Sequence, residues 1–407
     1  MTNKLQPPLP KLAFVYDRLN TRYGGAEYLI KLLLDAYPEA PIFTSVYHPQ
    51  AKWVDESRVK TSFLQKISWM RTRHQWLVPL MPLAFESLKL DKYDIIISLT
   101  TAEAKGVLTK PGQLHISYIF SPPKYLYEFN ERYQNSNFVL KFFYPVTNYV
   151  IRYLKWWDKQ ASLRPDLICT LSAITAKKIA SQYNLTSTTV YPPLKPKIVK
   201  TAAATQLATL LQNKSLEEYL IVANRLVSYK RTELAIKVAQ KLNKRILIVG
   251  TGNQLKHCAD LYPNQTFVRQ EGQNIVEVLH HSIQAQIIFL NQVDELELQL
   301  LFRFARAGLM LGDEDFGLVG AEMLNQGTPI VISRNSGLSE LLAGQSGVAV
   351  VDTFKPDEIV EQINQLPIRA TLDPQIQQRL SSEQFVKTWR SLIDREWRKH
   401  WRVCYTS

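Results

Sequence analysis

Cysteine is scarce in this chain of 407 residues, and the three that occur, Cys169, Cys258 and Cys404, lie far apart. Such spacing indicates neither a disulfide framework nor a set of zinc ligands. No apolar run approaches the roughly 18 residues of a membrane-spanning helix, and the first residues, MTNKLQPPLPKLAFVYD, lack the pattern of a secretory signal. We therefore expect a cytoplasmic protein that is neither secreted nor inserted across a membrane.

Negative charge is in short supply in the first half of the chain. Residues 1–192 contain 24 Lys and Arg against 14 Asp and Glu, a net charge of +10, and residues 193–407 contain 25 against 22, or +3. Basic and aromatic residues mix in residues 58–78 (RVKTSFLQKISWMRTRHQWLV) and 138–159 (FVLKFFYPVTNYVIRYLKWWDK). These stretches suit the inner membrane face or a lipid-linked substrate. A solvated helix face over an ordinary core explains the same letters, and no nucleic-acid-binding motif supports a nucleic-acid partner.

Short apolar runs alternate with helical patterns along the chain, which predicts an α/β fold with parallel sheets covered on both faces. The proline-rich segment YPPLKP (191–196) is typical of a domain link. We expect two doubly wound domains, 1–192 and 193–380, and a tail, 381–407, whose helix docks back on the first domain through five apolar residues on one face. The predicted strands are residues 12–16, 42–46, 94–99, 115–119, 167–171, 189–191, 219–223, 245–249, 287–290, 308–311 and 330–333.

The segment GDEDFGLVGAEMLNQGTPIV (312–331) places two glutamates around a turn that leads from a predicted strand into a helix. Free N–H groups near Gly317 and Leu318 would face the carboxyl edge of the sheet, where an anion such as a diphosphate is favoured. Glu314 precedes the turn and Glu322 lies one helical turn beyond it, so both carboxylates could accept sugar hydroxyls. Acidic residues that merely complement the helix dipole give the same pattern.

Three more loops follow predicted strands, where ligands of doubly wound sheets bind. Gly24 and Gly25 precede a helix and allow close approach of a phosphate. Arg225 and Lys230, in NRLVSYKR, could hold a diphosphate, although such cations are often only solvated. The third loop, Gly250-Thr-Gly252, lacks the last glycine of a dinucleotide fingerprint, so we interpret it as a tight turn.

Together GGAE, RLVSYKR and EDFGLVGAE resemble the retaining glycosyltransferases of family 4, which have the GT-B fold of two facing Rossmann-like domains with a cleft between them. The resemblance covers most of the chain, because SFLQKI, YDIIISLTTAEAKGV, SPPKYLY, SAITAKKI and YPPL are similar in order and spacing to the bacterial mannosyltransferase-like branch. It implies transfer of a hexose, with mannose from GDP-mannose favoured, to a glycan or lipid-linked acceptor in polysaccharide biosynthesis. It implies no cofactor and no metal.

The resemblance also implies roles for residues of this chain. Glu322 would accept hydrogen bonds from the ribose, Glu314 would hold hydroxyls of the donor sugar, and Arg225 and Lys230 would neutralise the diphosphate that leaves. The catalytic set would be Glu314, Arg225 and Lys230, and the donor-binding set Gly24, Gly25, Arg225, Lys230, Phe316, Gly317, Leu318, Val319 and Glu322.

One position departs from that branch. Relatives carry a histidine in the motif that here is YIFSPPKY (118–125), and the matching residue is Phe120. Either the sugar is held differently, or His115 or Lys124 substitutes, or the protein binds nucleotide-sugar or glycan without catalysis. Glycoside hydrolysis by Glu314 and Glu322 is a rival, but it leaves Arg225 and Lys230 unexplained. A GT-B epimerase or phosphorylase fits the fold with a different catalytic set. The segment 255–286 is longer than expected and has no assigned function.

Overall fold

The computed structural model describes residues 8–20, 24–67, 78–127, 144–196, 203–212, 218–282 and 284–405. The chain divides into two compact units. Unit 1 is Met1–Pro193 together with Ser382–Ser407, and unit 2 is Leu194–Ser381. The chain therefore passes between the units twice, after Pro193 and after Ser381. These two places lie side by side, because the amide of Leu194 donates to the carbonyl of Leu380 at 2.7 Å.

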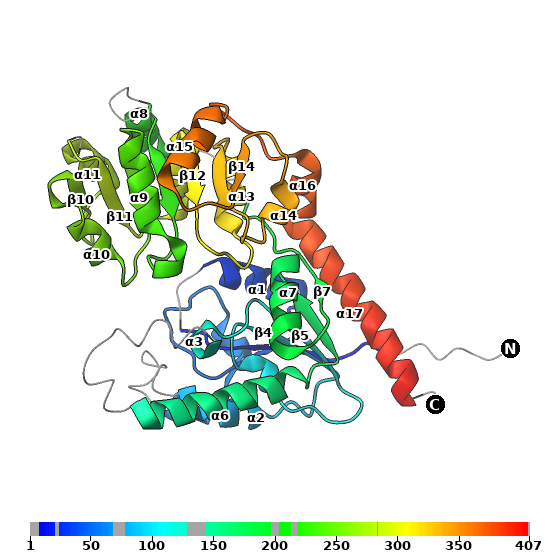
Figure 1. The fold of residues 1–407 in the computed structure, drawn as a ribbon. Helices are drawn as coiled ribbons and strands as arrows, with labels where there is room; N and C mark the ends of the chain where they lie inside the picture. The colour runs from blue at the N-terminus through cyan, green and yellow to red at the C-terminus, as the bar shows by residue number, and fades with distance from the viewer. Residues whose placement is uncertain are drawn as a thin grey trace. The chain divides into compact units, whose positions relative to one another are not determined.

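Unit 1 is a doubly wound parallel sheet in the order β3-β2-β1-β4-β5-β6-β7 (Figure 1). All five residues of β1 and all six of β4 are buried, as expected for strands covered on both faces. The strands are β1 (Leu12–Tyr16), β2 (Ile42–Thr44), β3 (Val59–Thr61), β4 (Ile95–Thr100), β5 (Leu114–Ile119), β6 (Leu167–Thr170) and β7 (Thr188–Thr189). The helices are α1 (Gly25–Ala36), α2 (Met81–Glu86), α3 (Lys124–Tyr127), α6 (Tyr144–Ser162), α7 (Ala173–Tyr183) and α17 (Ser382–Tyr405).

Unit 2 repeats this architecture in the order β10-β11-β9-β8-β12-β13-β14 (Figure 1). Its strands are β8 (Leu220–Ala223), β9 (Ile246–Val249), β10 (Thr266–Val268), β11 (Ile287–Asn291), β12 (Ala307–Met310), β13 (Ile330–Ser333) and β14 (Val348–Val351). Its helices are α8 (Ala203–Leu211), α9 (Thr232–Lys241), α10 (Leu255–Asp260), α11 (Ile275–His281), α12 (Glu295–Phe304), α13 (Leu318–Asn325), α14 (Ser339–Leu342), α15 (Pro356–Gln365) and α16 (Pro374–Arg379). The prediction of two doubly wound domains is confirmed.

Each sheet has a point where the direction of winding reverses. In unit 1 the chain winds outward from β1 to β3 and then returns to place β4 on the other side of β1. In unit 2 the corresponding neighbours are β8 and β12. Loops that follow such neighbouring strands diverge above the sheet and leave room for a ligand, so the functional site should be sought there.

The long helix α17 packs on unit 1 (Figure 1). Its five predicted contact residues, Phe385, Trp389, Leu392, Ile393 and Trp397, are all buried. The ring of Trp389 meets that of Tyr118 edge to face at 5.2 Å, and the indole of Trp397 donates to the carbonyl of Pro8 at 3.3 Å. The tail is therefore an integral part of unit 1.

Three strands were not predicted from the sequence, namely β3, β10 and β14. Each lies at the edge of its sheet. The strand β10 also explains the unexpected length of residues 255–286, because that segment contains α10, β10 and α11. The extra residues complete the sheet.

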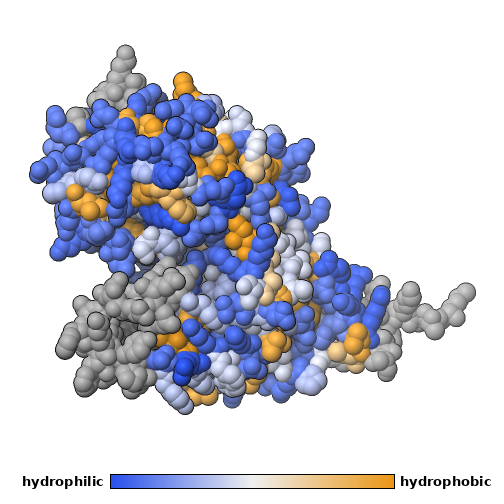
Figure 2. Space-filling view, viewed as in Figure 1, coloured by the Kyte–Doolittle hydropathy of each residue, from blue (hydrophilic) through white to orange (hydrophobic). Residues whose placement is uncertain are grey.

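Hydrophilic residues cover most of the described surface in the view of Figure 2, and hydrophobic residues form small separate patches. Among the described residues, no helix is both long enough and apolar enough to cross a membrane. Residues 68–77 and 138–143, parts of the two basic aromatic stretches, lie outside the described residues.

Candidate functional site

The loops after β8 and β12 meet at the reversal point of unit 2 and bring two predicted site residues together. The Lys230 ammonium forms an ion pair with the Glu314 carboxylate. Their side chains are only 13% and 15% exposed, yet neither is sealed from solvent. In such partly desolvated surroundings a charge pair is stronger than on an open surface and still reachable by a ligand.

Close backbone packing brings these loops together. A Cβ atom at Gly312 would lie 2.7 Å from the Cα of Lys230 and 2.8 Å from the carbonyl oxygen of Tyr229, so only glycine fits. The amide of Asp313 donates to the same carbonyl at 3.3 Å. The Lys230–Glu314 pair is therefore fixed by the backbone of both loops.

The loop from Glu314 to Gly317 is supported by the turn that follows β13. The carbonyl of Phe316 accepts from the amide of Leu338 at 2.6 Å and from the Ser336 hydroxyl at 2.9 Å. The Phe316 side chain is buried, so it anchors the loop and is not placed to contact a donor. Gly317 has a φ of 99°, and a Cβ there would lie 2.7 Å from the Ser336 hydroxyl. Both the backbone conformation and the lack of space therefore require glycine.

The helix α13 begins directly after Gly317, and its amino terminus has no side-chain cap. Leu318 and Val319 occupy its first turn and are partly buried. The uncapped N–H groups carry the positive end of the helix dipole, which favours an anion beside Lys230 and Glu314.

Glu322 lies on α13, one turn beyond Leu318. Burial raises the pKa of its carboxyl to about 7, with Lys195 opposing and Glu295 adding to the shift. These two neighbours pair with each other at 2.6 Å. Among the described residues no hydrogen bond to the Glu322 carboxyl is recorded, so it is able to accept one from a ligand.

Arg225 lies on the same loop as Lys230, and both cations contact Tyr229. The Arg225 side chain is exposed, and its guanidinium donates to the Tyr229 hydroxyl at 3.1 Å. The neighbouring glycines have a packing role. A Cβ at Gly250 would lie 1.9 Å from the carbonyl oxygen of Asn224, and one at Gly252 would lie 2.1 Å from that of Leu226. The tight turn expected at Gly250-Thr-Gly252 instead follows at Asn253 and Gln254, and the two glycines allow close packing against the loop after β8.

The reversal point of unit 1 is filled by buried polar contacts that the sequence did not point to. The Asp17 carboxylate accepts from the Thr100 hydroxyl and from the amides of Thr101 and Ala104, all within 2.8 Å. Lys105 and Asp158 form a fully buried ion pair at 2.5 Å. Only the position of Asp17 directly after a strand could have drawn attention to it.

The glycine pair of unit 1 has a different setting from the predicted phosphate cradle. Gly24 precedes α1 with an extended backbone, and a Cβ there would lie 2.8 Å from the buried Glu27 carboxylate. The helix amino terminus therefore already carries a negative charge, which argues against a phosphate contact at Gly24 or Gly25 in this conformation. Arg22 and Tyr23, which precede the pair, lie outside the described residues.

The three residues expected on the sugar side differ in access. His115 is fully buried early in β5, where its Nε2 meets the Ser98 hydroxyl at 2.9 Å and burial lowers its pKa to about 3. A neutral imidazole inside the sheet cannot contact a sugar, so we correct that expectation. Phe120 is buried at the carboxyl end of β5 with its ring against Tyr118, whereas Lys124 is partly exposed at the start of α3.

Comparison with known proteins agrees with this geometry. Residues 210–378 match the family model of glycosyl transferases group 1. The matched range lies within unit 2. The matched range contains Lys230, Glu314 and Glu322, and thus the whole candidate site of unit 2. No curated protein sequence matches this chain significantly.

Solved structures of glycosyltransferases resemble the whole chain. HepE from Anabaena, in complex with UDP-glucose, is 13% identical, with a TM-score of 0.62 and coverage of 95% of this chain and 99% of HepE. Sucrose-phosphate synthase from Thermosynechococcus elongatus is 13% identical, with a TM-score of 0.64 and coverage of 95% and 98%. WaaG, a glycosyltransferase involved in lipopolysaccharide biosynthesis, is 11% identical, with a TM-score of 0.56 and coverage of 97% and 100%. The fold is therefore GT-B.

Proposed function

We propose that this protein is a retaining hexosyltransferase that uses a nucleotide-diphosphate sugar. The observation that carries the proposal is the Lys230–Glu314 pair beside the uncapped amino terminus of α13, at the reversal point of unit 2. A cation and free N–H groups suit a diphosphate, and an adjacent carboxylate suits sugar hydroxyls. The family match over residues 210–378 supports the same reaction class.

In the proposed reaction, the bond between the anomeric carbon and the diphosphate oxygen breaks, and its electron pair goes to the diphosphate. The acceptor hydroxyl oxygen bonds to the anomeric carbon, and its proton passes to the leaving diphosphate. Lys230, with Arg225, stabilises the negative charge that grows on the diphosphate, which lowers the barrier when that contact is stronger in the transition state. As the diphosphate draws the ammonium away, Glu314 becomes available to the sugar.

Glu322 is assigned to the ribose of the donor. Its carboxyl is partly buried on α13 and carries no recorded hydrogen bond among the described residues, whereas ribose offers two hydroxyl donors. Because of the sequence resemblance, GDP-mannose is the first donor to test, with mannose as the sugar that is transferred. UDP-glucose is the second to test, because HepE binds it.

The reaction is proposed to need no metal, since Lys230 and the N–H groups of α13 supply positive charge to the diphosphate. We expect turnover to persist in excess EDTA. Loss of turnover in EDTA that returns with added Mg²⁺ or Mn²⁺ would overturn this part of the proposal.

The alternative is a noncatalytic nucleotide-sugar or glycan-binding protein, favoured by Phe120, whose ring can neither donate to a sugar hydroxyl nor carry a proton. Turnover of each donor by the wild type and by Glu314→Ala separates the two. The transferase predicts transfer by the wild type and its loss in the variant. Donor binding without transfer in both proteins would establish the alternative.

A lipid-linked acceptor at the inner membrane face is proposed from the two faces of α6. Ile151, Leu154 and Trp157 are buried against unit 1, whereas Tyr149, Tyr153, Trp156 and Leu163 beyond the helix end are exposed. Arg152 and Lys159 are exposed with them, and Asp158 is buried. Aromatic and basic side chains without an exposed carboxylate suit an anionic lipid surface.

This surface is tested by cosedimentation with vesicles that contain phosphatidylserine. We expect binding that falls with salt and weakens about fivefold in Arg152→Gln, from a contribution of about 1 kcal/mol for each basic residue. Trp156→Ser should also weaken binding, whereas Phe354→Ser, an exposed aromatic change outside both basic aromatic stretches, should not. Equal binding to neutral and anionic vesicles would contradict the proposal.

A further inference from the structure

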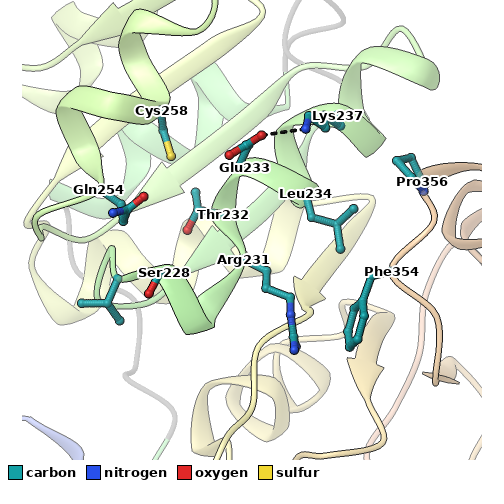
Figure 3. A pocket seen from close by; sticks show the side chains of 11 residues that line it. Ser228, Arg231, Thr232, Glu233, Leu234, Lys237, Gln254, Cys258, Phe354 and Pro356 are labelled. Carbon is teal, nitrogen blue, oxygen red and sulfur yellow. Dashed lines mark ion pairs between the residues drawn. The ribbon is translucent and has the colours of Figure 1, made fainter. Parts of the chain in front are cut away.

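A cavity of about 350 Å³ lies in unit 2 (Figure 3), and Glu322 is not among the residues that line it. It is lined by the first turn of α9, by Gln254 and Cys258, and by Phe354 and Pro356 at the start of α15. The helices α9 and α15 cover the face of the sheet to which Ala307 and Leu309 point. The helix α13 covers the opposite face, because Gly308 meets Met323 there. The cavity is therefore separate from the ribose site proposed at Glu322.

The cavity contains the amino terminus of α9, a ten-residue helix without a side-chain cap. The first turn of α9 carries one acid, Glu233, whose charge is offset by an ion pair with Lys237. The second feature of the cavity is Thr232, whose side chain lines it near Gln254 and Cys258 (Figure 3). Thr232 is 3% exposed, and its hydroxyl has no hydrogen-bond partner among the described residues. A buried hydroxyl without a partner costs free energy, so a ligand that pairs with it would relieve that cost. Helix N–H groups and a hydroxyl together suit a phosphate.

Two cations also border the cavity. Lys237 pairs with Glu233 at 2.6 Å (Figure 3), and the Arg231 guanidinium lies 3.8 Å from the centre of the Phe354 ring. Arg231 has a φ of 53°, a left-handed conformation that glycine would adopt with less strain. An arginine at such a position indicates that its side chain is required.

Arg231 also reaches the donor loop. Its guanidinium donates to the carbonyl of Leu311 at 2.8 Å and to the Asp313 carboxylate at 3.2 and 3.3 Å. Asp313 directly precedes Glu314. A new anion beside Arg231 would compete with Asp313 for the guanidinium and so change the support of the Lys230–Glu314 pair.

We propose that this cavity is an effector site for a small phosphomonoester. The phosphate would bind the N–H groups at the start of α9, the Thr232 hydroxyl and the Lys237 ammonium, and the body would pack on Leu234 and Phe354. The volume is near the lower end of ligand pockets, about 300 Å³, so the ligand is small. Its binding would alter the affinity of the donor site through Arg231, and the donor would alter its affinity by the same factor.

The site is tested by calorimetric titration of the full chain with phenyl phosphate, inorganic phosphate and phenol. Thr232→Val and Lys237→Met should each weaken phenyl phosphate about tenfold, as expected for lost hydrogen bonds to a charged group. Lys241→Met is the matched control, because Lys241 is on the same helix, is 47% exposed like Lys237, and pairs with Asp357 at 2.5 Å. Thr232→Val should leave the melting temperature of the ligand-free protein unchanged or higher.

Several results would overturn the site. One is the absence of phenyl phosphate binding at millimolar concentration. Another is a Lys241→Met variant that binds phenyl phosphate as weakly as Lys237→Met does. A third is a loss of phenyl phosphate affinity in Glu322→Gln as large as in Thr232→Val, which would place the anion at the donor site. Binding of inorganic phosphate alone would overturn the ligand class.

The coupling rests on the proposed function and has its own test. Phenyl phosphate should change the dissociation constant of the nucleotide in the wild type and have little effect on it in Arg231→Met. A nucleotide that binds but does not respond would overturn the effector role. A protein that binds phenyl phosphate and no nucleotide would instead contradict the donor site of the proposed function.

Discussion

Units 1 and 2 are both seven-stranded parallel sheets with one reversal of winding, and each has a lysine–carboxylate pair near that reversal point, but the two pairs differ in access. Lys105 and Asp158 in unit 1 are 0% and 2% exposed, and the hydroxyls of Tyr127 and Tyr183 both donate to Asp158 at 2.7 Å. Lys230 and Glu314 in unit 2 are 13% and 15% exposed and lie beside an uncapped helix. The pair near the reversal point is thus sealed inside the protein in unit 1, whereas in unit 2 it is accessible, and there we propose that the donor binds.

The comparison shows why the fold alone does not identify the site. Both reversal points satisfy the topological rule for ligand binding. In unit 1 buried donors already satisfy Asp17 and Asp158, so these carboxylates are committed to the protein. In unit 2 the Glu322 carboxyl has no recorded partner among the described residues. The free hydrogen-bonding capacity of a carboxylate separates the two cases.

The largest expected effect is on the buried pair. Asp158→Ala leaves the Lys105 ammonium buried without its counter-ion, so we expect the free energy of unfolding of unit 1 to fall by about 3–5 kcal/mol. Denaturant titration measures this. Lys31→Met, which removes a surface pair with Asp35, should change it by less than about 1 kcal/mol. A similar small loss for both would show that the Lys105–Asp158 pair is not structural.

The matching change in unit 2 should affect activity more than stability. Lys230→Met removes the cation proposed to stabilise the diphosphate, and we expect kcat to fall about 10²- to 10³-fold, or about 2.7–4 kcal/mol in the barrier. Steady-state transfer assays measure this. The exposed Lys244, paired with Glu218, supplies a control variant, Lys244→Met, with wild-type turnover. Normal turnover in Lys230→Met would remove Lys230 from the mechanism.

The smallest effect concerns the pH dependence of stability. Because burial raises the pKa of Glu322 to about 7, the folded state binds its proton more tightly than the unfolded state does. This contribution to stability is complete below the unfolded pKa and is lost as pH rises through about 7. Glu322→Gln should therefore gain stability over the wild type between pH 5 and pH 8, by at most about 3 kcal/mol. A constant difference in denaturant titrations at the two pH values would rule out the raised pKa.

Most of the fold could be predicted from the sequence, and the missing parts share one property. Each of the eleven predicted strands has a counterpart in the structure. Ten of them are inner strands, where continuous apolar runs are expected, and the eleventh, β7, is an edge strand. The strands β3, β10 and β14 are edge strands. In β3 and β10 no residue is buried, and in β14 only alternate residues are. Such short runs carry little pattern to recognise.

The candidate site was predictable in residues but not in contacts. Lys230 and Glu314 follow strands and were expected in the site, but their direct pairing depends on the close approach of Gly312 to Lys230. Asp17 and Thr100 are 83 positions apart, so their hydrogen bond has no local signal. His115 was chosen for its chemistry, and only its burial in β5 shows that it is inaccessible.

The most direct test of a donor site in unit 2 is thermal stabilisation by GDP, UDP, ADP and their sugar conjugates. A ligand that binds only the folded state raises the melting temperature. We predict a selective shift with one nucleotide and its sugar conjugate, and a much smaller shift in Glu322→Ala. No shift with any nucleotide, or a shift unchanged in Glu322→Ala, would contradict the account.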